Sequence, residues 1–470
     1  MLQASPLGKV GQNVAVLPND NMKILIIGLG VGGLYASKYA ISTNRKASVT
    51  IIEKRDFDQF SPCGLPYAIE GVVKDFAELR YSVPEIGRLK KLLSHEVQSV
   101  DVPGRKLAVK NLKSGEVTVM DWDSLVFATG ADPTNLPIPG AKELLGKGVH
   151  FCTTPAGAQA IKEAALSSKK KAACVVGGGA TGLEVAAALK VLGLEVHVTK
   201  RTPPVMVDIF DPEMGKMVED KIAQLGMKQY FGKGIDSING QNSVESVTIA
   251  GEVIPCDLVV MAAGMKARTQ LAEGTGIAVN KNGFITNERM ETNIPGVFAV
   301  GDCAESYCRL DGSKGPPLLA TTAYRQGAIA GINAAGGSAK YKGFYNTFVS
   351  FVGDMEMAAT GMNLEAAKKA GYENAKSISA KGDLRPHYIH NNSELNIRLV
   401  VDGNTGKILG GQAIGKEGAA WRINVIGVML THGLTVFDLE DAELAYCPPV
   451  SDVFDVLSRA ADIAIKRIGK

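Results

Sequence analysis

A single cysteine stands in a stretch whose residue types suit redox chemistry. Cys63 lies in F-S-P-C-G-L-P-Y, residues 60–67, and the next cysteine along the chain is Cys152. The thiolate is the reactive form of cysteine, and a helix N-terminus lowers the pKa of a thiol. Proline and glycine around Cys63 predict a turn that enters such a helix. The pattern indicates either a reactive lone thiol or a buried, inert cysteine, as Cys174 and Cys256 in apolar runs are expected to be.

A glycine-rich loop precedes this cysteine. The segment that starts K-I-L-I-I-G-L-G-V-G-G at residue 23 places Gly28, Gly30 and Gly33 in the pattern G-x-G-x-x-G, between an apolar run and a helix-like stretch. The next apolar run ends on Glu53, 20 positions after Gly33. In a βαβ unit, such glycines let the backbone approach a pyrophosphate at a helix N-terminus, and the carboxylate binds ribose hydroxyls. The spacing predicts a dinucleotide site.

The same pattern occurs a second time. Residues 171–201 place Gly177, Gly179 and Gly182 between an apolar run and a helix-like stretch, and another strand-like run follows. Two such units in one chain are improbable as two unrelated glycine-tolerant turns. We therefore expect two dinucleotide-binding units.

The second unit ends differently from the first. Its last strand-like run leads into Lys200 and Arg201, whereas the corresponding run of the first unit ends on Glu53. A carboxylate repels the 2′-phosphate of NADP, and cations attract it. The sequence therefore predicts NADPH as the preferred coenzyme, with NADH as the alternative if these cations are only solvated surface charges.

Three further apolar runs end on small or acidic residues. D-S-L-V-F-A-T-G ends on Ala128, Thr129 and Gly130, and D-L-V-V-M-A-A-G repeats that form up to Gly264. N-I-P-G-V-F-A-V-G-D ends on Asp302, whose carboxylate is placed to accept a hydroxyl of a flavin's ribityl chain. Arg325 and Gln326 are interpreted as the exposed first turn of the helix that follows.

These motifs resemble the FAD-dependent pyridine nucleotide-disulfide oxidoreductases, from residue 23 to nearly the end of the chain. C-G-L-P-Y together with L-A-Y-C-P-P, residues 444–449, resembles their single-cysteine branch, which holds coenzyme A disulfide reductases, NADH oxidases and persulfide or polysulfide reductases. The resemblance implies an α/β fold with two Rossmann-like domains, for FAD and NAD(P), and a C-terminal α+β dimerisation domain. The cofactor-binding residues are then Gly28, Gly30, Gly33, Glu53, Lys54, Ala128, Thr129, Gly130, Gly177, Gly179, Gly182, Glu184, Lys200, Arg201, Gly264 and Asp302.

The resemblance also divides the chain. The expected parts are a flexible lead-in, 1–21; the FAD domain, 22–147 and 281–345; the NAD(P) domain, 148–280; and the dimerisation domain, 346–470. A homodimer is the expected assembly.

The resemblance gives the single cysteine a role. The thiolate of Cys63 attacks a disulfide, a mixed disulfide forms, and its reduction releases the substrate thiolate and regenerates Cys63. In coenzyme A disulfide reductases, tyrosines of the partner subunit approach the cysteine, and Tyr388 and Tyr446 match their positions. Ordinary interface packing is the alternative role for both tyrosines.

The residues at two positions narrow the range of possible electron acceptors. Oxidases and peroxidases of the branch carry a histidine in the first glycine loop, where this chain has Val31. Without such a general acid, the reduction of an oxidised Cys63 is expected to be about 10²–10⁴-fold slower. Relatives that hold coenzyme A commonly have asparagine before the cysteine, where this chain has Pro62. We expect a disulfide, persulfide or polysulfide acceptor. The alternatives are NADH oxidase activity with oxygen and, from another class, a membrane-surface NADH:quinone oxidoreductase or a flavoprotein without turnover.

Composition excludes other classes. With 470 residues and a net charge of +3, the chain lacks the basic excess of a nucleic-acid binder. Seven irregularly spaced cysteines predict no disulfide framework, and therefore a reducing, cytoplasmic location. No apolar run reaches the roughly 20 residues of a membrane span, and we expect no metal.

Overall fold

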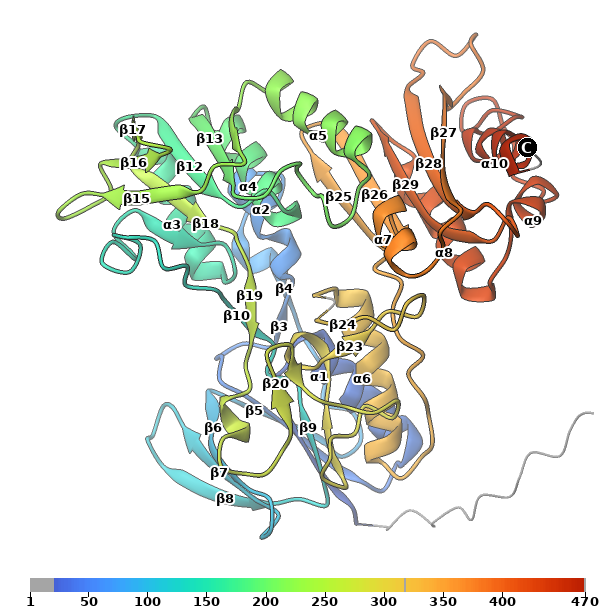
Figure 1. Cartoon of the computed structure of the whole chain (residues 1–470). Coiled ribbons are helices and arrows are strands. Elements are labelled where there is room, and N and C mark those ends of the chain that lie inside the picture. The colour runs from blue at the N-terminus through green and yellow to red at the C-terminus, as the bar shows by residue number, and fades with distance from the viewer. Residues whose placement is uncertain (1–20, 317, 469–470) are drawn as a thin grey trace, which may run out of the picture.

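The computed structural model describes residues 21–316 and 318–468, so the predicted lead-in lies almost wholly outside the described residues. Three bodies, each built on a five-stranded sheet, make up the chain. In Figure 1, the first body lies at the bottom, the second at the upper left and the C-terminal body at the upper right.

The first body contains a parallel sheet that joins distant parts of the sequence. Its strand order is β22–β9–β1–β2–β5, and residues 24–27 of β1 are buried at its centre. Helices α1 and α6 pack side by side (Figure 1). Their close approach requires glycine at residue 327, because a Cβ on Gly327 would lie 2.3 Å from the Gly32 oxygen. The elements are β1 (Lys23–Ile27), α1 (Val31–Thr43), β2 (Ser48–Glu53), β5 (Leu89–Leu93), β6 (His95–Asp101), β7 (Lys106–Asn111), β8 (Val117–Asp121), β9 (Ser124–Phe127), β22 (Val297–Ala299) and α6 (Ala320–Ala334).

The second body repeats this plan. Its parallel sheet has the order β11–β18–β12–β13–β14, and the short apolar run of β12 again lies at the centre. The elements are β11 (Val149–Phe151), α3 (Pro155–Ser167), β12 (Ala172–Val176), α4 (Ala180–Val191), β13 (Glu195–Lys200), α5 (Pro212–Gln224), β14 (Lys228–Phe231), β15 (Ile235–Asn239), β16 (Ser246–Ile249), β17 (Glu252–Pro255) and β18 (Leu258–Met261). The fold is therefore α/β with two dinucleotide-binding domains, as predicted.

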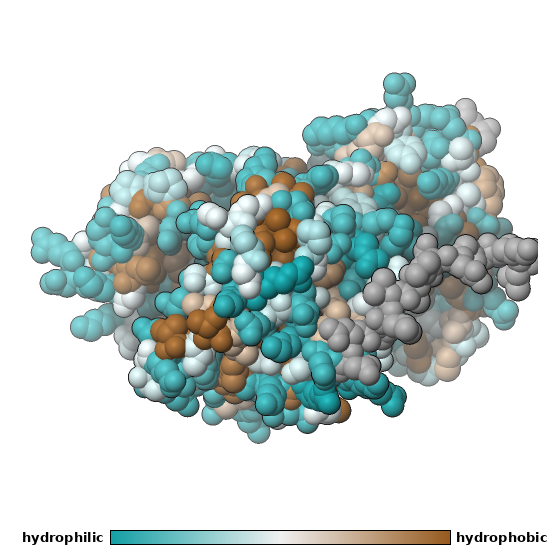
Figure 2. Space-filling view, turned by 90° about the horizontal axis from the view of Figure 1, so that it is seen from below, coloured by the Kyte–Doolittle hydropathy of each residue, from teal (hydrophilic) through white to brown (hydrophobic). Residues whose placement is uncertain are grey.

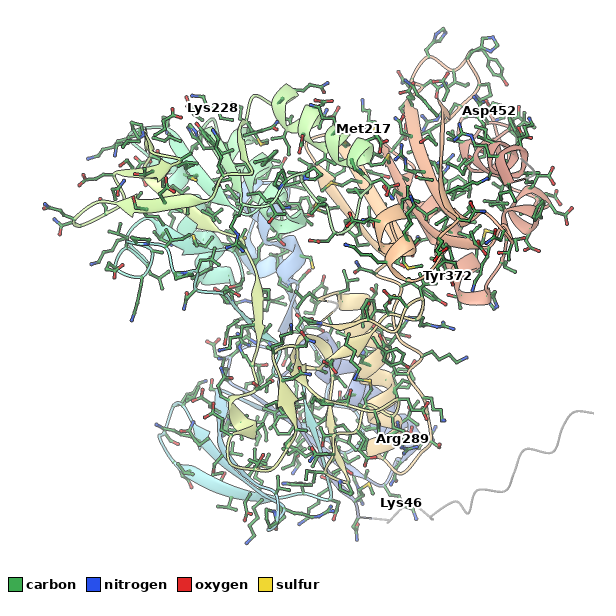
Figure 3. The ribbon with its side chains drawn as sticks, in the orientation of Figure 1. Lys46, Met217, Lys228, Arg289, Tyr372 and Asp452 are labelled. Atoms are coloured by element: carbon green, nitrogen blue, oxygen red, sulfur yellow. The ribbon has the colours of Figure 1, made fainter. Side chains whose placement is uncertain are left out.

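The C-terminal body is an antiparallel sheet covered by helices. Its strand order is β25–β26–β29–β28–β27. The elements are β25 (Phe348–Val352), β26 (Met355–Gly361), α7 (Leu364–Lys369), β27 (Ala375–Asp383), β28 (Glu394–Asp402), β29 (Ile408–Gly415), α8 (Ala419–His432), α9 (Val436–Glu440) and α10 (Val456–Ile468). At its joint with the second body, Ser377 Oγ donates to Asp211 at 2.7 Å and the Asp211 N–H donates to Gln412 at 2.8 Å; Met217 of α5 lies at the same joint (Figure 3).

The short elements connect the bodies. A two-stranded ribbon, β10 paired with β19, joins the first two bodies, and the Arg268 guanidinium bonds Asp132 across it at 2.6 Å (Figure 1). Helix α2, which directly follows Cys63, belongs to the first part of the sequence but packs against α3 and α4 of the second body. The short elements are β3 (Gln59–Phe60), η1 (Pro62–Gly64), α2 (Leu65–Glu70), η2 (Phe76–Leu79), β4 (Arg80–Tyr81), β10 (Ala131–Pro133), β19 (Met265–Ala267), η3 (Gln270–Ala272), β20 (Val279–Asn280), β21 (Gly283–Phe284), η4 (Gly301–Cys303), β23 (Ser306–Tyr307) and β24 (Lys314–Gly315).

The surface is mainly polar. On the face drawn in Figure 2, hydrophilic groups predominate and apolar groups form separate patches. Within the described residues, no helix is both long and apolar enough to span a bilayer. All seven cysteines are free thiols.

A buried ion pair holds α10 to α8. The Arg422 side chain is 1% exposed and bonds Asp455 through two nitrogens, at 2.5 and 3.3 Å. We expect Arg422→Ala to lower the apparent free energy of unfolding by about 3–5 kcal/mol, because it leaves a buried carboxylate unpaired. Urea unfolding followed by tryptophan fluorescence measures the change. In the control, Lys466→Ala removes an exposed pair and costs less than about 1 kcal/mol; equal losses for both variants would contradict the prediction.

Candidate active site

The first glycine loop packs against the end of β9. Gly28 has φ +104°, and a Cβ there would lie 2.4 Å from the Ala128 oxygen. A Cβ on Gly33 would lie 2.0 Å from the Gly28 oxygen, whereas a Cβ on Gly30 would meet nothing within 4 Å. The outer glycines are therefore required by close backbone packing, and the middle glycine faces open space.

The second loop has the same geometry. A Cβ on Gly177, at φ +134°, would lie 2.3 Å from the Ala262 oxygen, and one on Gly182 would lie 2.2 Å from the Gly177 oxygen. Gly179 again faces open space. Gly30 and Gly179 are the N-caps of α1 and α4, and neither has a capping side chain. Both loops thus offer free N–H groups and room for a pyrophosphate, so the residues fit two dinucleotides.

The predicted ribose ligand of the first loop is Glu53, which is 6% exposed. Its carboxylate accepts the Leu29 N–H at 2.7 Å and the Arg55 side chain at 2.8 and 2.9 Å. Burial acts to raise the pKa of Glu53, but the hydrogen bonds and charge of Arg55 outweigh it and hold that pKa below its usual value. The carboxylate is therefore fixed in its charged form, and Arg55 is a residue that the sequence did not single out. Lys54 is exposed.

Lys200 occupies the place in the second body that Glu53 occupies in the first. The first glycine of each loop donates its N–H to the residue before that position, Ile52 or Thr199, at 2.8 and 2.9 Å. Each of the two side chains ends the strand that follows its glycine loop. The carboxylate of the first site is thus replaced by a cation.

The two predicted cations, Lys200 and Arg201, differ in hydrogen bonding and in exposure. The Lys200 ammonium donates to the Thr202 and Pro204 oxygens at 2.5 and 3.0 Å, and burial lowers its pKa. Arg201, by contrast, is exposed. Within the second glycine unit, Arg201 is therefore the better placed of the two to meet a phosphate from solvent.

Asp302 lies in the turn η4, where the Gln326 oxygen accepts the Gly301 N–H at 2.8 Å. Among the described residues, none donates a hydrogen bond to the Asp302 carboxylate, and burial raises its pKa although Arg268 partly opposes the shift. A half-buried carboxylate without a protein donor fits a flavin hydroxyl. The sequence interpretation of Gln326 as exposed is wrong: it is 0% exposed, because the face of α6 on which it lies packs toward the sheet.

The predicted residues that follow β9 and β18 lie where these strands lead into the ribbon of β10 and β19, between the first two bodies. Thr129 Oγ1 donates to the Arg268 oxygen at 2.7 Å, and Arg268 returns a bond to the Thr129 oxygen at 2.9 Å. Gly130 and Gly264 take positive φ values of +71° and +85° in the turns of this ribbon. These residues connect the two nucleotide loops.

Cys63 is exposed in η1, immediately before α2. The pKa of its thiol is raised by loss of hydration in its surroundings and then by the charges of Glu184 and Asp302. The sequence led us to expect a lowered pKa. The direction is reversed because loss of hydration raises the pKa of the thiol and the charges of Glu184 and Asp302 act in the same direction, against a helix of only six residues.

A hydrogen-bond network near Cys63 links all three bodies. The Ser350 hydroxyl of β25 donates to Glu184 of α4 at 2.7 Å, and the Tyr67 hydroxyl of α2 also bonds this carboxylate. Burial and Glu184 raise the pKa of Tyr67 to about 12, so it is a neutral donor. Tyr67 stands in the C-G-L-P-Y motif, but no sequence signal pointed to Ser350.

The two tyrosines predicted to act on Cys63 lie together. The Tyr388 hydroxyl is the main group that raises the pKa of Tyr446, and the two side chains are 54% and 49% exposed. Tyr388 lies in the loop between β27 and β28, which Figure 1 shows on the far side of the C-terminal sheet from α2. Within one chain, the pair does not approach Cys63.

The family of pyridine nucleotide-disulphide oxidoreductases matches residues 22–327, and the dimerisation domain of that family matches residues 348–457. An NADH oxidase of Methanocaldococcus jannaschii is 34% identical over 95% of this chain and 99% of its own. An NAD(P)H coenzyme A polysulfide/persulfide reductase of Pyrococcus horikoshii is 32% identical over 93% of this chain and 97% of its own. The solved structure of an NAD-dependent persulfide reductase from A. fulgidus has a TM-score of 0.89 and 30% identity, and covers 95% of this chain and 84% of that one.

The packing of Gly33 makes FAD binding testable. Gly33→Ala adds a Cβ within 2.0 Å of a backbone oxygen. We expect the affinity for FAD to fall about tenfold or more, because such overpacking costs about 1–3 kcal/mol. The flavin-to-protein absorbance ratio of the purified protein measures it. Gly315→Ala, where a Cβ meets nothing within 4 Å, is the control; equal flavin content in both variants would refute the assignment of this loop.

Proposed function

Because the chain belongs to the pyridine nucleotide-disulphide oxidoreductase family, whose members bind FAD and NAD(P)H, we propose that it reduces a small-molecule disulfide, persulfide or polysulfide through Cys63. The observation that carries this proposal is the exposed Cys63 thiol directly before α2, a helix that packs against α3 and α4 of the second nucleotide domain. Four of the other cysteines are buried: Cys152, Cys174, Cys256 and Cys303.

The proposed chemistry balances with one protein thiol. The Cys63 thiolate attacks a substrate disulfide R–S–S–R, forms Cys63–S–S–R and expels one R–S⁻. Bound FAD would supply the electron pair taken as hydride from NAD(P)H. That pair breaks the mixed disulfide and releases the second R–S⁻ and the Cys63 thiolate. Two protons convert both products to R–SH. The substrate's own thiol thus takes the place of a second protein cysteine.

We place Tyr388 and Tyr446 at the cysteine of a second copy of the chain. The two side chains lie on an exposed surface of the C-terminal domain, and the Tyr388 hydroxyl raises the pKa of Tyr446. This surface includes large exposed apolar side chains, Val450, Val453 and Phe454, that a homodimer would cover. The pair would then donate a proton to the departing R–S⁻.

Oxygen is the second candidate acceptor, because one relative at 34% identity is an NADH oxidase. The first glycine loop argues against it in this chain. Val31, at the start of α1, stands where oxidases of the branch carry a histidine, and its side chain has no proton to donate to an oxidised Cys63. With a sulfur acceptor, the tyrosine pair would instead donate the proton that the departing thiolate needs.

Cys63→Ser tests this function. We expect NADPH to reduce the flavin in the variant as in the wild type, while reoxidation by coenzyme A disulfide or polysulfide slows at least about 10³-fold because the nucleophile is lost. Stopped-flow absorbance measures both steps. Cys308→Ser, at a half-buried cysteine, is the control. Equal sulfur-dependent reoxidation in both variants contradicts the proposal, and faster reoxidation of the wild type by oxygen than by any sulfur compound favours the oxidase.

We also propose NADPH as the preferred coenzyme, because a cation replaces the carboxylate and Arg201 is exposed. Arg201→Ala is expected to raise KM for NADPH about tenfold and to leave KM for NADH within about twofold, since only NADPH carries the 2′-phosphate. Steady-state kinetics with both coenzymes measures this. Lys228→Ala is the control, because this lysine lies on the outer surface of the same body (Figure 3). A wild-type enzyme that favours NADH would overturn the proposal.

A further inference from the structure

The helix that follows Cys63 packs in the second body, although the strands on either side of it in the sequence lie in the first. The segment between β2 and β5 leaves the first sheet and returns to it, and its two arms pair as β3 with β4. Between these arms, Leu65, Ala68 and Ile69 of α2 are at most 1% exposed and lie in the apolar core formed with α3 and α4 (Figure 1). Cys63 is thus held between the paired arms and a helix that another body buries.

Helix α2 is too short to be stable by itself. It has six residues, and isolated helices shorter than about 12 residues are marginal in water. Among the described residues, the apolar core of the first body contains no side chain of α2. The order of this helix therefore depends mainly on its contacts with α3 and α4.

A lysine of the second body caps the C-terminal end of α2. Lys162 Nζ on α3 donates to the Ala68 oxygen at 2.7 Å and lies 5.8 Å from the centre of the Phe76 ring. The last carbonyl groups of a helix have no partner within the helix, and a cation near them is favourable. The Lys162 side chain is half-buried. It therefore anchors the helix that begins directly after the thiol.

The same packing reaches the second glycine loop. Helix α4 begins after Gly179, the N-cap that has room for a pyrophosphate. The Leu183 and Ala187 side chains of α4 lie in the core that buries α2. A dinucleotide bound at this N-cap would therefore contact the helix on which α2 packs.

We propose that α2 moves as part of the second nucleotide body, that Lys162 is the positioning residue that anchors it there, and that a coenzyme bound at the second glycine loop therefore orders the segment that holds Cys63. The proposal rests on the proposed function, since it concerns how the same thiol is held. It adds a link between coenzyme binding and the position of the nucleophile.

The test is hydrogen exchange of the full-length, FAD-loaded enzyme with and without NADP⁺, followed by mass spectrometry of peptic peptides. NADP⁺ carries no hydride, so the flavin stays oxidised. A ligand that binds only the closed state slows a fully linked opening by the factor 1 + [L]/Kd, which is about 100-fold at 100 times Kd. We expect exchange in residues 65–71 to slow at least about threefold, together with exchange in residues 177–184. Protection of residues 177–184 without any change in residues 65–71 overturns the proposal.

Lys162→Met tests the anchor, because it keeps an unbranched apolar side chain and removes the ammonium group. We expect exchange in residues 65–71 to become about two- to tenfold faster, the range expected for loss of a cation at a helix C-terminus. Reoxidation of the reduced flavin by coenzyme A disulfide or polysulfide should slow, while its reduction by NADPH stays within about twofold of wild type. Lys162→Arg keeps the cation and should restore both values.

Lys170→Met is the matched control. Lys170 Nζ donates to the Glu245 oxygen at 2.8 Å, so this variant removes a lysine-to-carbonyl bond of the same kind within the same body. Equal exchange in residues 65–71 for Lys162→Met and Lys170→Met overturns the role of Lys162. A purely structural role is also distinguishable, because it would speed exchange throughout α3 and α4 as well as in α2.

Hydrogen exchange separates this inference from the proposed function, because it is measured without turnover. If Cys63→Ser leaves sulfur-dependent reoxidation unchanged, the proposed function fails, and the link between the coenzyme and α2 is still decided by the exchange of residues 65–71.

Discussion

The arrangement depends on two places where backbone meets backbone without a side chain between. At Gly28 and Gly177, a Cβ would lie 2.4 and 2.3 Å from a carbonyl oxygen of the neighbouring strand. This approach lets α1 and α4 begin directly at the ends of the central strands, where their free N–H groups point away from the sheet. Because the same constraint operates twice, both nucleotide loops have one geometry, and the ribbon of β10 and β19 fixes their separation.

Glu53 and Cys63, at the two ends of the site, have opposite electrostatic environments. At Glu53, Arg55 forms an ion pair with the buried carboxylate and keeps that carboxylate ionised. At Cys63, burial and then the charges of Glu184 and Asp302 raise the pKa of the thiol, and burial also raises the pKa of Glu184 against its hydrogen bond from Ser350. The first arrangement gives a fixed ligand for a ribose. In the second arrangement, burial and charge act in the same direction on the thiol.

The sequence predicted most of the fold because its strongest signals are local. Each glycine loop, with its flanking apolar strands and the acidic or basic residue that follows, lies within about 30 residues, and the structure has them as expected. Contacts between distant residues were not predictable. Ser350 meets Glu184 across 166 positions, and Gln326 is buried by packing that its own helix pattern did not reveal. The direction of the Cys63 pKa shift was missed for the same reason, since the groups that bury the thiol, and the charges of Glu184 and Asp302 that add to the effect, come from other segments.

The location of the tyrosine pair bears on why one cysteine is enough. An enzyme with two active-site cysteines keeps the second sulfur in the protein itself. Here the thiol directly precedes α2, which packs on the second body, whereas Tyr388 lies between β27 and β28 and Tyr446 between α9 and α10, elements that Figure 1 shows on the side of the third body away from α2. If these tyrosines protonate the leaving thiolate, the site is complete only between two chains, and the gap between them must admit a substrate. The β25 strand, which contributes Ser350 to Glu184, belongs to the same sheet as the tyrosine loop. One sheet therefore contacts the second nucleotide body of its own chain through Ser350 and, if the tyrosines act as proposed, the thiol of the other chain.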